Sequence, residues 1–162
     1  MIPRISVIMG IYNCAHTLAE ALDSLLAQTY QDFKVIMCND GSNDDTYKIA
    51  ASYAASNPTK FVLINNERNM GLNYTLNHCL KYADTEFVAR MDGDDISLPS
   101  RFEKEINFLD EHPEITIVSS PMIYFDEDGD FRNGGGIEKY PTKNDFINGT
   151  PFCHAPCMVR TE

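Results

Sequence analysis

The sequence predicts an α/β protein built on a central, mostly parallel sheet with helices on both faces. Short apolar runs alternate with segments of helical spacing along most of the 162 residues, and this alternation is typical of a parallel sheet. The first runs are apolar on both faces, as buried central strands are. Several runs end in loops rich in Asn, Asp, Gly and Ser, which favour turns.

Six apolar runs predict the strands. Each is short, rich in β-branched or aromatic residues, and bounded by polar turn formers, as strands are. The expected strands are residues 5–11, 32–38, 61–64, 87–91, 115–120 and 151–160. The run at 122–125 is expected to continue or bend the fifth strand.

Between the strands, leucines and other apolar residues recur at helical spacing. The expected helices are 18–28, 45–56, 72–83, 99–111 and a short one over 143–149. Asn13 is placed to cap the first helix, Asn43 or Asp44 the second, and Pro99 suits the start of the fourth. Asn77 in the third helix implies either a buried hydrogen bond or an exposed position, because asparagine is a poor helix former.

Two segments of the C-terminal third are expected to be turns or loops. The acidic stretch 126–130 could imitate a calcium loop. It lacks the flanking helices and the distal glutamate of such a loop, so we expect a hairpin turn. Gly134–Gly136 is expected to be a mobile loop.

The end of the fourth strand gives the strongest chemical signal. Asp92, Asp94 and Asp95 gather around Gly93 directly after an apolar run, and ligands of open α/β sheets bind at such strand ends. Two like charges about 4 Å apart repel by roughly 4 kcal/mol at an effective dielectric near 20. A hard divalent cation would reverse that repulsion, because Mg²⁺ and Mn²⁺ prefer oxygen ligands. An acidic turn that binds nothing is the alternative.

The composition narrows the classes of ligand and partner that the protein could bind. The formal net charge of −11 argues against the basic surface that nucleic acid or an anionic membrane would need. The negative charge would also repel a phosphate ligand. A cation bound between the protein and the phosphate would remove this repulsion. The length predicts one domain over residues 1–162. No run of about 18 apolar residues occurs, so we expect no membrane-spanning helix.

The five cysteines indicate a reducing compartment. Their number is odd and several lie in expected helices or strands, so we expect no disulfide framework. Cys153, His154 and Cys157 could suggest zinc, but the partner pair of ligands is missing, and we expect none. We expect no signal peptide at residues 1–4, because the apolar run after them is strand-length and lacks a cleavage pattern.

Together, the motifs resemble the family 2 glycosyltransferases, which have the Rossmann-like GT-A fold. The matching features, in chain order, are residues 6–9 with Tyr12 and Asn13, Asn39 to Ser42 with Asp44, Asn69 to Gly71 with Asn77, Asp92 to Asp95, Pro99 with Arg101, and His112 with Pro113. Their joint order covers the chain from Arg4 to Arg160. Neither a dinucleotide Gly-x-Gly-x-x-Gly fingerprint nor a Walker-type Gly-Lys-Ser/Thr accompanies them.

The resemblance implies a nucleoside diphosphate sugar donor, most often a UDP-sugar, and a divalent metal, Mn²⁺ or Mg²⁺. The residues it assigns to the nucleotide are Tyr12, Asp40, Arg68, Asn69 and Asp92. Tyr12 would line the base pocket and Asp40 would hydrogen-bond the base. Arg68 and Asn69 would lie close to the nucleotide, and Asp92 would contact the ribose or the donor sugar.

The resemblance assigns the metal to Asp94 and places Gly93 and Asp95 near the donor sugar. A cation there would stabilise the leaving diphosphate. Family 2 enzymes mostly invert the anomeric centre, which needs a carboxylate base. In the family the base motif follows the segment that matches 154–160, and no residue here matches it. We therefore expect a donor-binding part that lacks the acceptor and base segment and is weakly active or inactive alone.

Two other functions stay open. A metal-dependent nucleotidyltransferase uses a similar sheet, but it usually has a Gly-rich loop with a basic residue where residues 10–13 have none. A non-catalytic module that binds nucleotide sugars is the second. For the glycosyltransferase, the resemblance implies a glycan or lipid-linked acceptor and bacterial polysaccharide biosynthesis. It also implies a cytoplasmic location that includes the inner face of the membrane.

Overall fold

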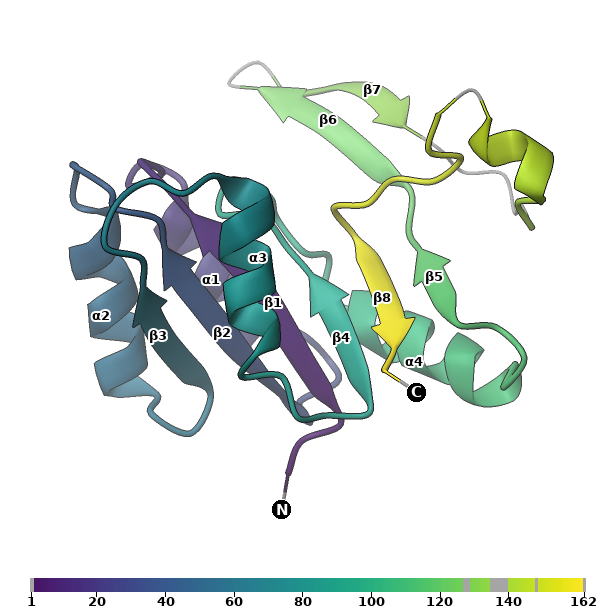
Figure 1. The fold of residues 1–162 in the computed structure, drawn as a ribbon, viewed down its shortest axis with the longest axis horizontal. Helices are drawn as coiled ribbons and strands as arrows, with labels where there is room; N and C mark the ends of the chain where they lie inside the picture. Colours follow the sequence, from purple (N-terminus) through teal and green to yellow (C-terminus); the bar gives the residue numbers. More distant parts are fainter. Residues whose placement is uncertain (1, 127–128, 135–139, 148, 162) are drawn as a thin grey trace.

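The structure is a computed structural model that describes residues 2–126, 129–134, 140–147 and 149–161. Its centre is a six-stranded sheet in the order β3-β2-β1-β4-β8-β5 (Figure 1). The strands are β1 (Ile5–Ile11), β2 (Phe33–Asn39), β3 (Phe61–Asn65), β4 (Phe87–Arg90), β5 (Ile117–Ser119) and β8 (Cys157–Arg160). β1 to β4 are parallel, whereas β8 runs antiparallel to both of its neighbours. The mostly parallel α/β sheet is therefore confirmed.

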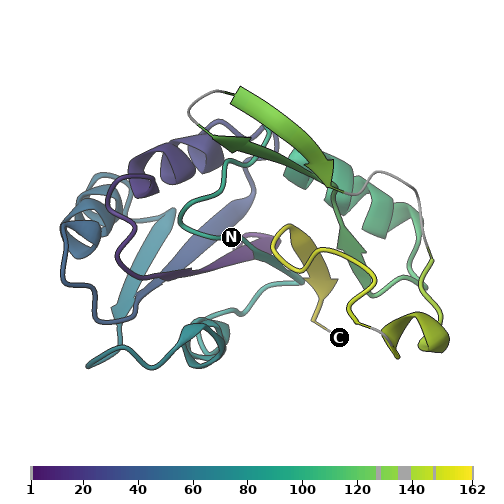
Figure 2. The same cartoon turned by 90° about the horizontal axis from the view of Figure 1, so that it is seen from above.

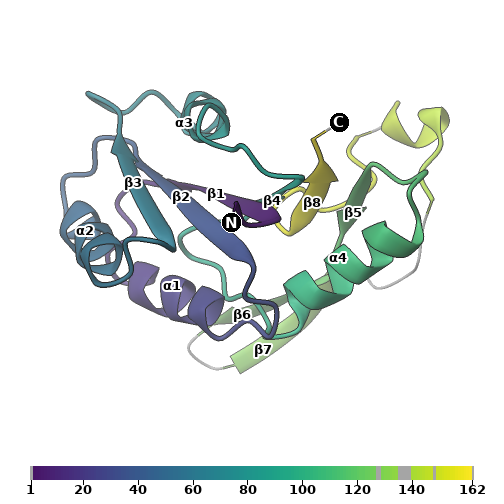
Figure 3. The same cartoon turned by 90° about the horizontal axis from the view of Figure 1, so that it is seen from below.

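Helices cover both faces of this sheet, as expected. They are α1 (Leu18–Leu26), α2 (Thr46–Ser56), α3 (Leu72–Leu80) and α4 (Arg101–Glu111). Figure 3 shows α1, α2 and α4 on one face and α3 on the other. Within the described residues, each helix is too short or too polar to span a bilayer.

Alternation along the strands divides the core in two. Val7 and Met9 of β1 pack with Leu22 of α1 and Phe102 of α4 in the larger cluster. Ile8, between them in sequence, faces a smaller cluster beneath α3. Each fully buried aliphatic side chain contributes about 1.5–3 kcal/mol, so the larger cluster dominates the stability of the sheet.

The buried face of α3 differs from the expected leucine stripe. Leu72 and Leu80 are 44% and 43% exposed, while Thr75 and Cys79 are the buried residues. Asn77 is exposed and its amide donates to the carbonyl of Asn73 at 2.8 Å. The exposed alternative for Asn77 is therefore the correct one.

Asn13 does not cap α1, which was the expectation. It has a left-handed backbone with φ of 48°, and its side-chain oxygen accepts from the backbone N–H of Asn43 at 2.8 Å. Thr17 precedes α1 instead. The Asp44 carboxylate accepts from the Thr46 N–H at 3.0 Å, at the start of α2. Asparagine tolerates the left-handed region. The hydrogen bond between Asn13 and Asn43 joins the loops that follow β1 and β2.

The C-terminal third departs furthest from expectation. Residues 122–125 do not continue the fifth strand. They lie in β6 (Met122–Asp126), which pairs with β7 (Gly129–Gly134) in a separate two-stranded sheet (Figure 2). Pro121 has no N–H to donate, so it ends pairing with the main sheet. β6 and β7 pair antiparallel on either side of the expected turn at 126–130, of which residues 127–128 lie outside the described residues.

The expected last strand is shorter than 151–160. Only Cys157–Arg160 forms β8, because Pro151 and Pro156 cannot donate to a sheet ladder. β8 also lies between β4 and β5. The expected short helix is a single 3-10 turn at Lys143–Phe146. Gly135 and Gly136 of the expected glycine loop lie outside the described residues.

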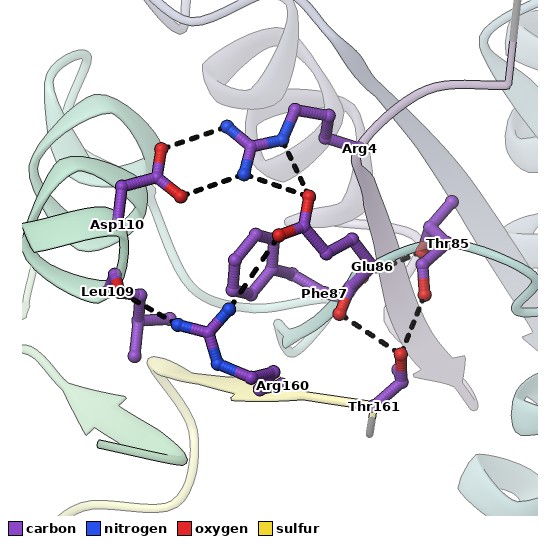
Figure 4. Close-up of polar contacts among 8 residues, drawn as sticks. All are labelled: Arg4, Thr85, Glu86, Phe87, Leu109, Asp110, Arg160 and Thr161. Atoms are coloured by element: carbon purple, nitrogen blue, oxygen red, sulfur yellow. Dashed lines mark hydrogen bonds and ion pairs between the residues drawn. The ribbon is translucent and has the colours of Figure 1, made fainter. Parts of the chain in front are cut away.

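A polar network fastens this arrangement at the end of the sheet where β1 and β4 begin (Figure 4). Arg4 donates to both oxygens of Asp110 on α4 at 2.8 and 2.9 Å and to Glu86 at 2.8 Å. Arg160 of β8 donates to the carbonyl of Leu109 at 2.7 Å. The network joins β1, β4, β8 and α4 far from the loops that follow the strands.

Candidate functional site

The candidate site lies at the opposite edge, where the parallel strands end (Figure 1). The loops after β1, β2, β3 and β4 meet there because parallel strands share one carboxyl edge. They bring together most of the residues that the sequence singled out. Two pockets are present at this edge, one on the α3 side and one beside the acidic loop.

The first is the α3-side pocket, with a volume of about 170 Å³. Its lining residues are Gly10, Ile11, Tyr12, Asp40, Asn69, Gly71, Leu72 and Thr75. Tyr12, Asp40 and Asn69 were all expected near a nucleotide. Tyr12 is 43% exposed, so it is available for stacking.

Asp40 is the most constrained residue of this pocket. It is 3% exposed, and its Oδ1 accepts from the Asn66 amide at 2.7 Å and from the Met70 N–H at 2.8 Å. Its Oδ2 accepts from the Gly71 N–H at 2.9 Å. Burial alone would raise the pKa of Asp40, but these hydrogen bonds outweigh it and lower the pKa. A carboxylate has about four acceptor positions, so one position on Oδ2 remains.

Asn66 links Asp40 to a second layer of side chains. Its Nδ2 donates to Asp40 and to the Thr75 hydroxyl at 3.0 Å. Its Oδ1 lies 2.8 Å from His78 Nδ1. Because the amide oxygen can only accept, His78 Nδ1 must carry the proton. Thr75 and His78 thus orient Asn66, which in turn orients Asp40.

Gly41 allows the loops after β2 and β3 to touch. Its φ is +73°, and a Cβ there would lie 2.7 Å from the backbone carbon of Arg68 and 2.8 Å from the backbone nitrogen of Asn69. Only glycine combines this conformation with such a close approach. The side chain of Arg68 is exposed and does not line the pocket.

The second, the acidic pocket, lies beside the loop after β4 and has a volume of about 280 Å³. Asp94, Asp95 and Ile96 form one wall, and residues 122–125 of β6 form another. The remaining lining residues, Thr17, Glu20 and Ala21, come from the start of α1 and the residue before it. The Thr17 hydroxyl donates to the Gly93 carbonyl at 2.9 Å and holds the acidic loop against α1.

The three aspartates of this loop differ in their surroundings. Asp92 is paired with Arg90 and Asp94 is exposed. Asp95 is partly buried, so desolvation raises its pKa, and the charges of Asp92 and Asp94 raise it further. A Cβ at Gly93 would lie 2.8 Å from Cys14 Sγ. The loop is therefore packed closely at its glycine and open at Asp94.

This donor set suits a hard cation only with help from a ligand. Among the described residues, no three His, Cys, Asp or Glu side chains already converge as a metal site. Mg²⁺ and similar ions usually bind through one or two carboxylates together with substrate phosphates and water. The exposed Asp94 carboxylate, flanked by two further acids, fits a cation that arrives with a diphosphate.

The cysteines have other surroundings. All five are free thiols in the described part of the chain. The Cys153 thiol lies 3.3 Å from the Met122 sulfur and helps to attach the segment before β8 to β6.

Sequence reasoning missed Asn66, Thr75 and His78, which orient Asp40. The amide-rich loop at 65–69 was visible, but neither the hydroxyl nor the imidazole stands out within a helix pattern. Arg90 was also missed, although a charged residue at the end of an apolar strand is a recognisable signal.

Comparison with known proteins gives a consistent result. Residues 6–162 match the family model described as Glycosyl transferase family 2. EpsE of Bacillus subtilis (strain 168) is 44% identical over 158 residues, which cover 98% of this chain and 56% of that protein. The amylovoran biosynthesis glycosyltransferase AmsE of Erwinia amylovora is 35% identical over 161 residues, which cover 95% of this chain and 58% of that protein. The chain thus spans a little more than half the length of these relatives.

Solved structures share the fold. S. aureus TarS 1-349, in complex with UDP-GlcNAc, is 31% identical with a TM-score of 0.65, covering 70% of this chain and 33% of that one. The mannosyltransferase PcManGT of Pyrobaculum calidifontis, in complex with GDP-Man and Mn²⁺, has a TM-score of 0.73 at 22% identity. The match covers 99% of this chain and 45% of that one. From the family match and the identity to these relatives, the chain belongs to glycosyltransferase family 2.

Proposed function

We propose that this chain is the donor-binding part of an inverting, metal-dependent glycosyltransferase that uses a nucleoside diphosphate sugar. The observation that carries the proposal is the pair of pockets at one sheet edge. The α3-side pocket suits a nucleobase, and the acidic loop beside it suits a cation with its diphosphate. The nucleotide-sugar complexes of TarS and PcManGT support this class of donor.

Uracil is the base that the α3-side pocket fits best. The remaining acceptor position of Asp40 can take one N–H, and uracil offers one at N3. Guanine presents adjacent N1–H and N2–H donors, so one would stay unpaired at a cost of about 1–3 kcal/mol if buried. The exposed Tyr12 side chain can stack on the base, and Asn69 lines the same pocket. We place Arg68 outside the base pocket, where its exposed side chain can approach the nucleotide.

Asp94 is the residue that would hold the cation. Asp92 and Asp95 add negative charge on either side of it, and Gly93 keeps the loop close to β1. When bound, Mn²⁺ or Mg²⁺ would supply Lewis acidity to the leaving diphosphate. The chain's own contribution is to position the donor and to tie the acidic loop to α1.

We further propose a glycan or lipid-linked acceptor, in polysaccharide biosynthesis at the cytoplasmic face of a membrane. The name of the relative AmsE, an amylovoran biosynthesis glycosyltransferase, supports this context. We assign no residue of this chain as the carboxylate that would deprotonate the acceptor. We therefore expect donor binding to be stronger than transfer.

The test is calorimetric titration of UDP, UDP-GlcNAc, GDP and GDP-Man, each with and without Mn²⁺. We expect binding of a UDP compound that Mn²⁺ strengthens, and loss of the Mn²⁺ effect in Asp94→Ala. Asp32→Ala is the matched control, because this exposed carboxylate lies at the other end of the sheet, just before β2.

An absence of binding to all four compounds would favour a module without this function. An equal Mn²⁺ response in wild type and Asp94→Ala would remove Asp94 as the ligand. Product analysis separates the remaining alternative, because a nucleotidyltransferase releases pyrophosphate and a glycosyltransferase releases a nucleoside diphosphate.

A further inference from the structure

Arg90 has more N–H groups than protein partners. It is the last residue of β4 and is 7% exposed. Its Nη2 donates to Asp92 Oδ1 at 2.5 Å. Its Nε and Nη1 are buried and have no hydrogen-bond partner among the described residues. Leaving a buried donor unpaired costs about 1–3 kcal/mol, and more for a charged group, so these two N–H groups call for a partner.

The unpaired groups lie on the α3 side of the sheet, at its carboxyl edge. Val88 packs in the cluster beneath α3 and Ala89 in the other one, so Arg90 shares the face of Val88. Ala89 pairs with Met158 in the antiparallel ladder, which places Cys157 beside Arg90. Figure 1 shows the segment leading into β8 next to the end of β4.

In the part of the chain that the structure describes, Glu105 Oε2 is also a buried polar atom without a hydrogen-bond partner. Glu105 is not the partner of the unpaired Arg90 N–H groups. Glu105 belongs to α4, which packs on the opposite face of the sheet (Figure 3). Its other oxygen is already held by Arg101 Nε at 3.1 Å and by the Ser120 hydroxyl.

The pair of Arg90 and Asp92 is chemically complementary to a hydroxyl group. A guanidinium only donates hydrogen bonds and a carboxylate only accepts them, whereas a hydroxyl does both. The Asp92 side chain is 26% exposed and the Arg90 side chain 8%, so Asp92 opens to the ligand edge and Arg90 lies directly behind it. A phosphate would be repelled by Asp92, whereas a neutral sugar would use both partners.

We propose that Arg90 is a donor-sugar-binding residue that holds Asp92 with Nη2 and donates from Nη1 or Nε to a sugar oxygen. The inference rests on the proposed function, because it needs a donor bound across the acidic loop. It adds that recognition of the sugar is separable from recognition of the nucleotide. Arg90 then contributes to affinity for the nucleotide sugar and not for the nucleoside diphosphate.

The experiment compares two affinities in each variant, those for UDP and UDP-GlcNAc with Mn²⁺, or for GDP and GDP-Man if the wild type prefers them. In Arg90→Gln we expect affinity for the diphosphate to stay within about twofold and affinity for the sugar nucleotide to fall about tenfold, the size of one charged hydrogen bond. Asp92→Asn should lower the same ratio. Arg90→Lys keeps the charge and should lose less.

Arg4→Gln is the matched control. It removes another arginine paired with acids, in the network at the far end of the sheet (Figure 4), and should leave both affinities unchanged. Circular dichroism melts of each variant report folding separately. If Arg90→Gln does not fold, the two affinities are compared in Arg90→Lys instead.

An equal loss of both affinities, or no loss of either, would overturn the proposal and assign the free N–H groups to buried water. A wild type that binds the diphosphate as tightly as the sugar nucleotide would also overturn it, while leaving the proposed nucleotide site intact. A wild type that binds none of these compounds would defeat the proposed function itself.

Discussion

Replacing Asp40 by asparagine tests the centre of the α3-side pocket. The carboxylate accepts three hydrogen bonds, from the Asn66 amide and from the backbone N–H groups of Met70 and Gly71. The asparagine side chain has one oxygen and one NH₂ group. At least one of the three donors would therefore face another donor, and the others would lose the charge of their acceptor.

The expected cost follows from these contacts. A hydrogen bond to a charged group contributes about 1.5–3 kcal/mol, a neutral one about 0.5–1.5, and an unpaired buried group costs about 1–3. The N–H groups of Met70 and Gly71 are partly buried, so water can replace some of the loss. We expect Asp40→Asn to lower the free energy of unfolding by about 2–3 kcal/mol, which in a domain of this size corresponds to a melting temperature lower by roughly 4–12 °C.

Urea unfolding monitored by circular dichroism measures this change, with Asp32→Asn as a control for charge alone. The same variant should bind UDP about tenfold more weakly even without Mn²⁺, because the base loses a charged acceptor. A loss of stability below about 0.5 kcal/mol, the scale of an ordinary surface substitution, would refute the assigned role of Asp40 in holding the loop after β3. An unchanged UDP affinity would remove Asp40 from base recognition.

Three further predictions concern other features. Gly41→Ala should destabilise the protein by at least about 1–2 kcal/mol and weaken UDP binding, since φ is +73° and the new Cβ meets backbone; normal stability and affinity in urea unfolding and calorimetry would contradict this. The lowered pKa of Asp40 predicts stabilisation that is present above about pH 4, the unfolded value, and is lost as the pH falls through the folded value. Unfolding between pH 5 and 2 should therefore show a steeper loss in wild type than in Asp40→Asn, and parallel curves would count against it. Arg4→Ala should cost about 1 kcal/mol and less at high salt, because its ion pairs are partly exposed; a salt-independent loss in urea unfolding would argue for packing instead.

Hydrophobic spacing predicted the parallel part of the fold well and the C-terminal third poorly. β1 and β2 are almost wholly buried on both faces, so the apolar pattern alone identifies them as central strands. The run at 115–125 contains Pro121, and the pattern does not say that pairing changes sheets there. The position of β8 depends on pairing between distant segments, which no local signal encodes.

The site shows a similar division. Asp40 and Asp94 stand out because polar residues follow apolar strands, and both line pockets at the carboxyl edge. The residues that orient Asp40, such as Asn66 and His78, have no distinctive spacing. Arg68 has a suitable position in the chain but an exposed side chain. Its part in nucleotide binding stays a prediction.

The place of β8 in the strand order bears on how the protein is made. A ribosome extends chains by about 5–20 residues per second, so β1 to β4 emerge several seconds before the strand that covers the outer side of β4. During that interval β4 is an apolar strand with an uncovered ladder, which can template aggregation. Slower translation of the segment between β4 and β8 should therefore lower the soluble yield, and chaperones that shield nascent chains should restore it.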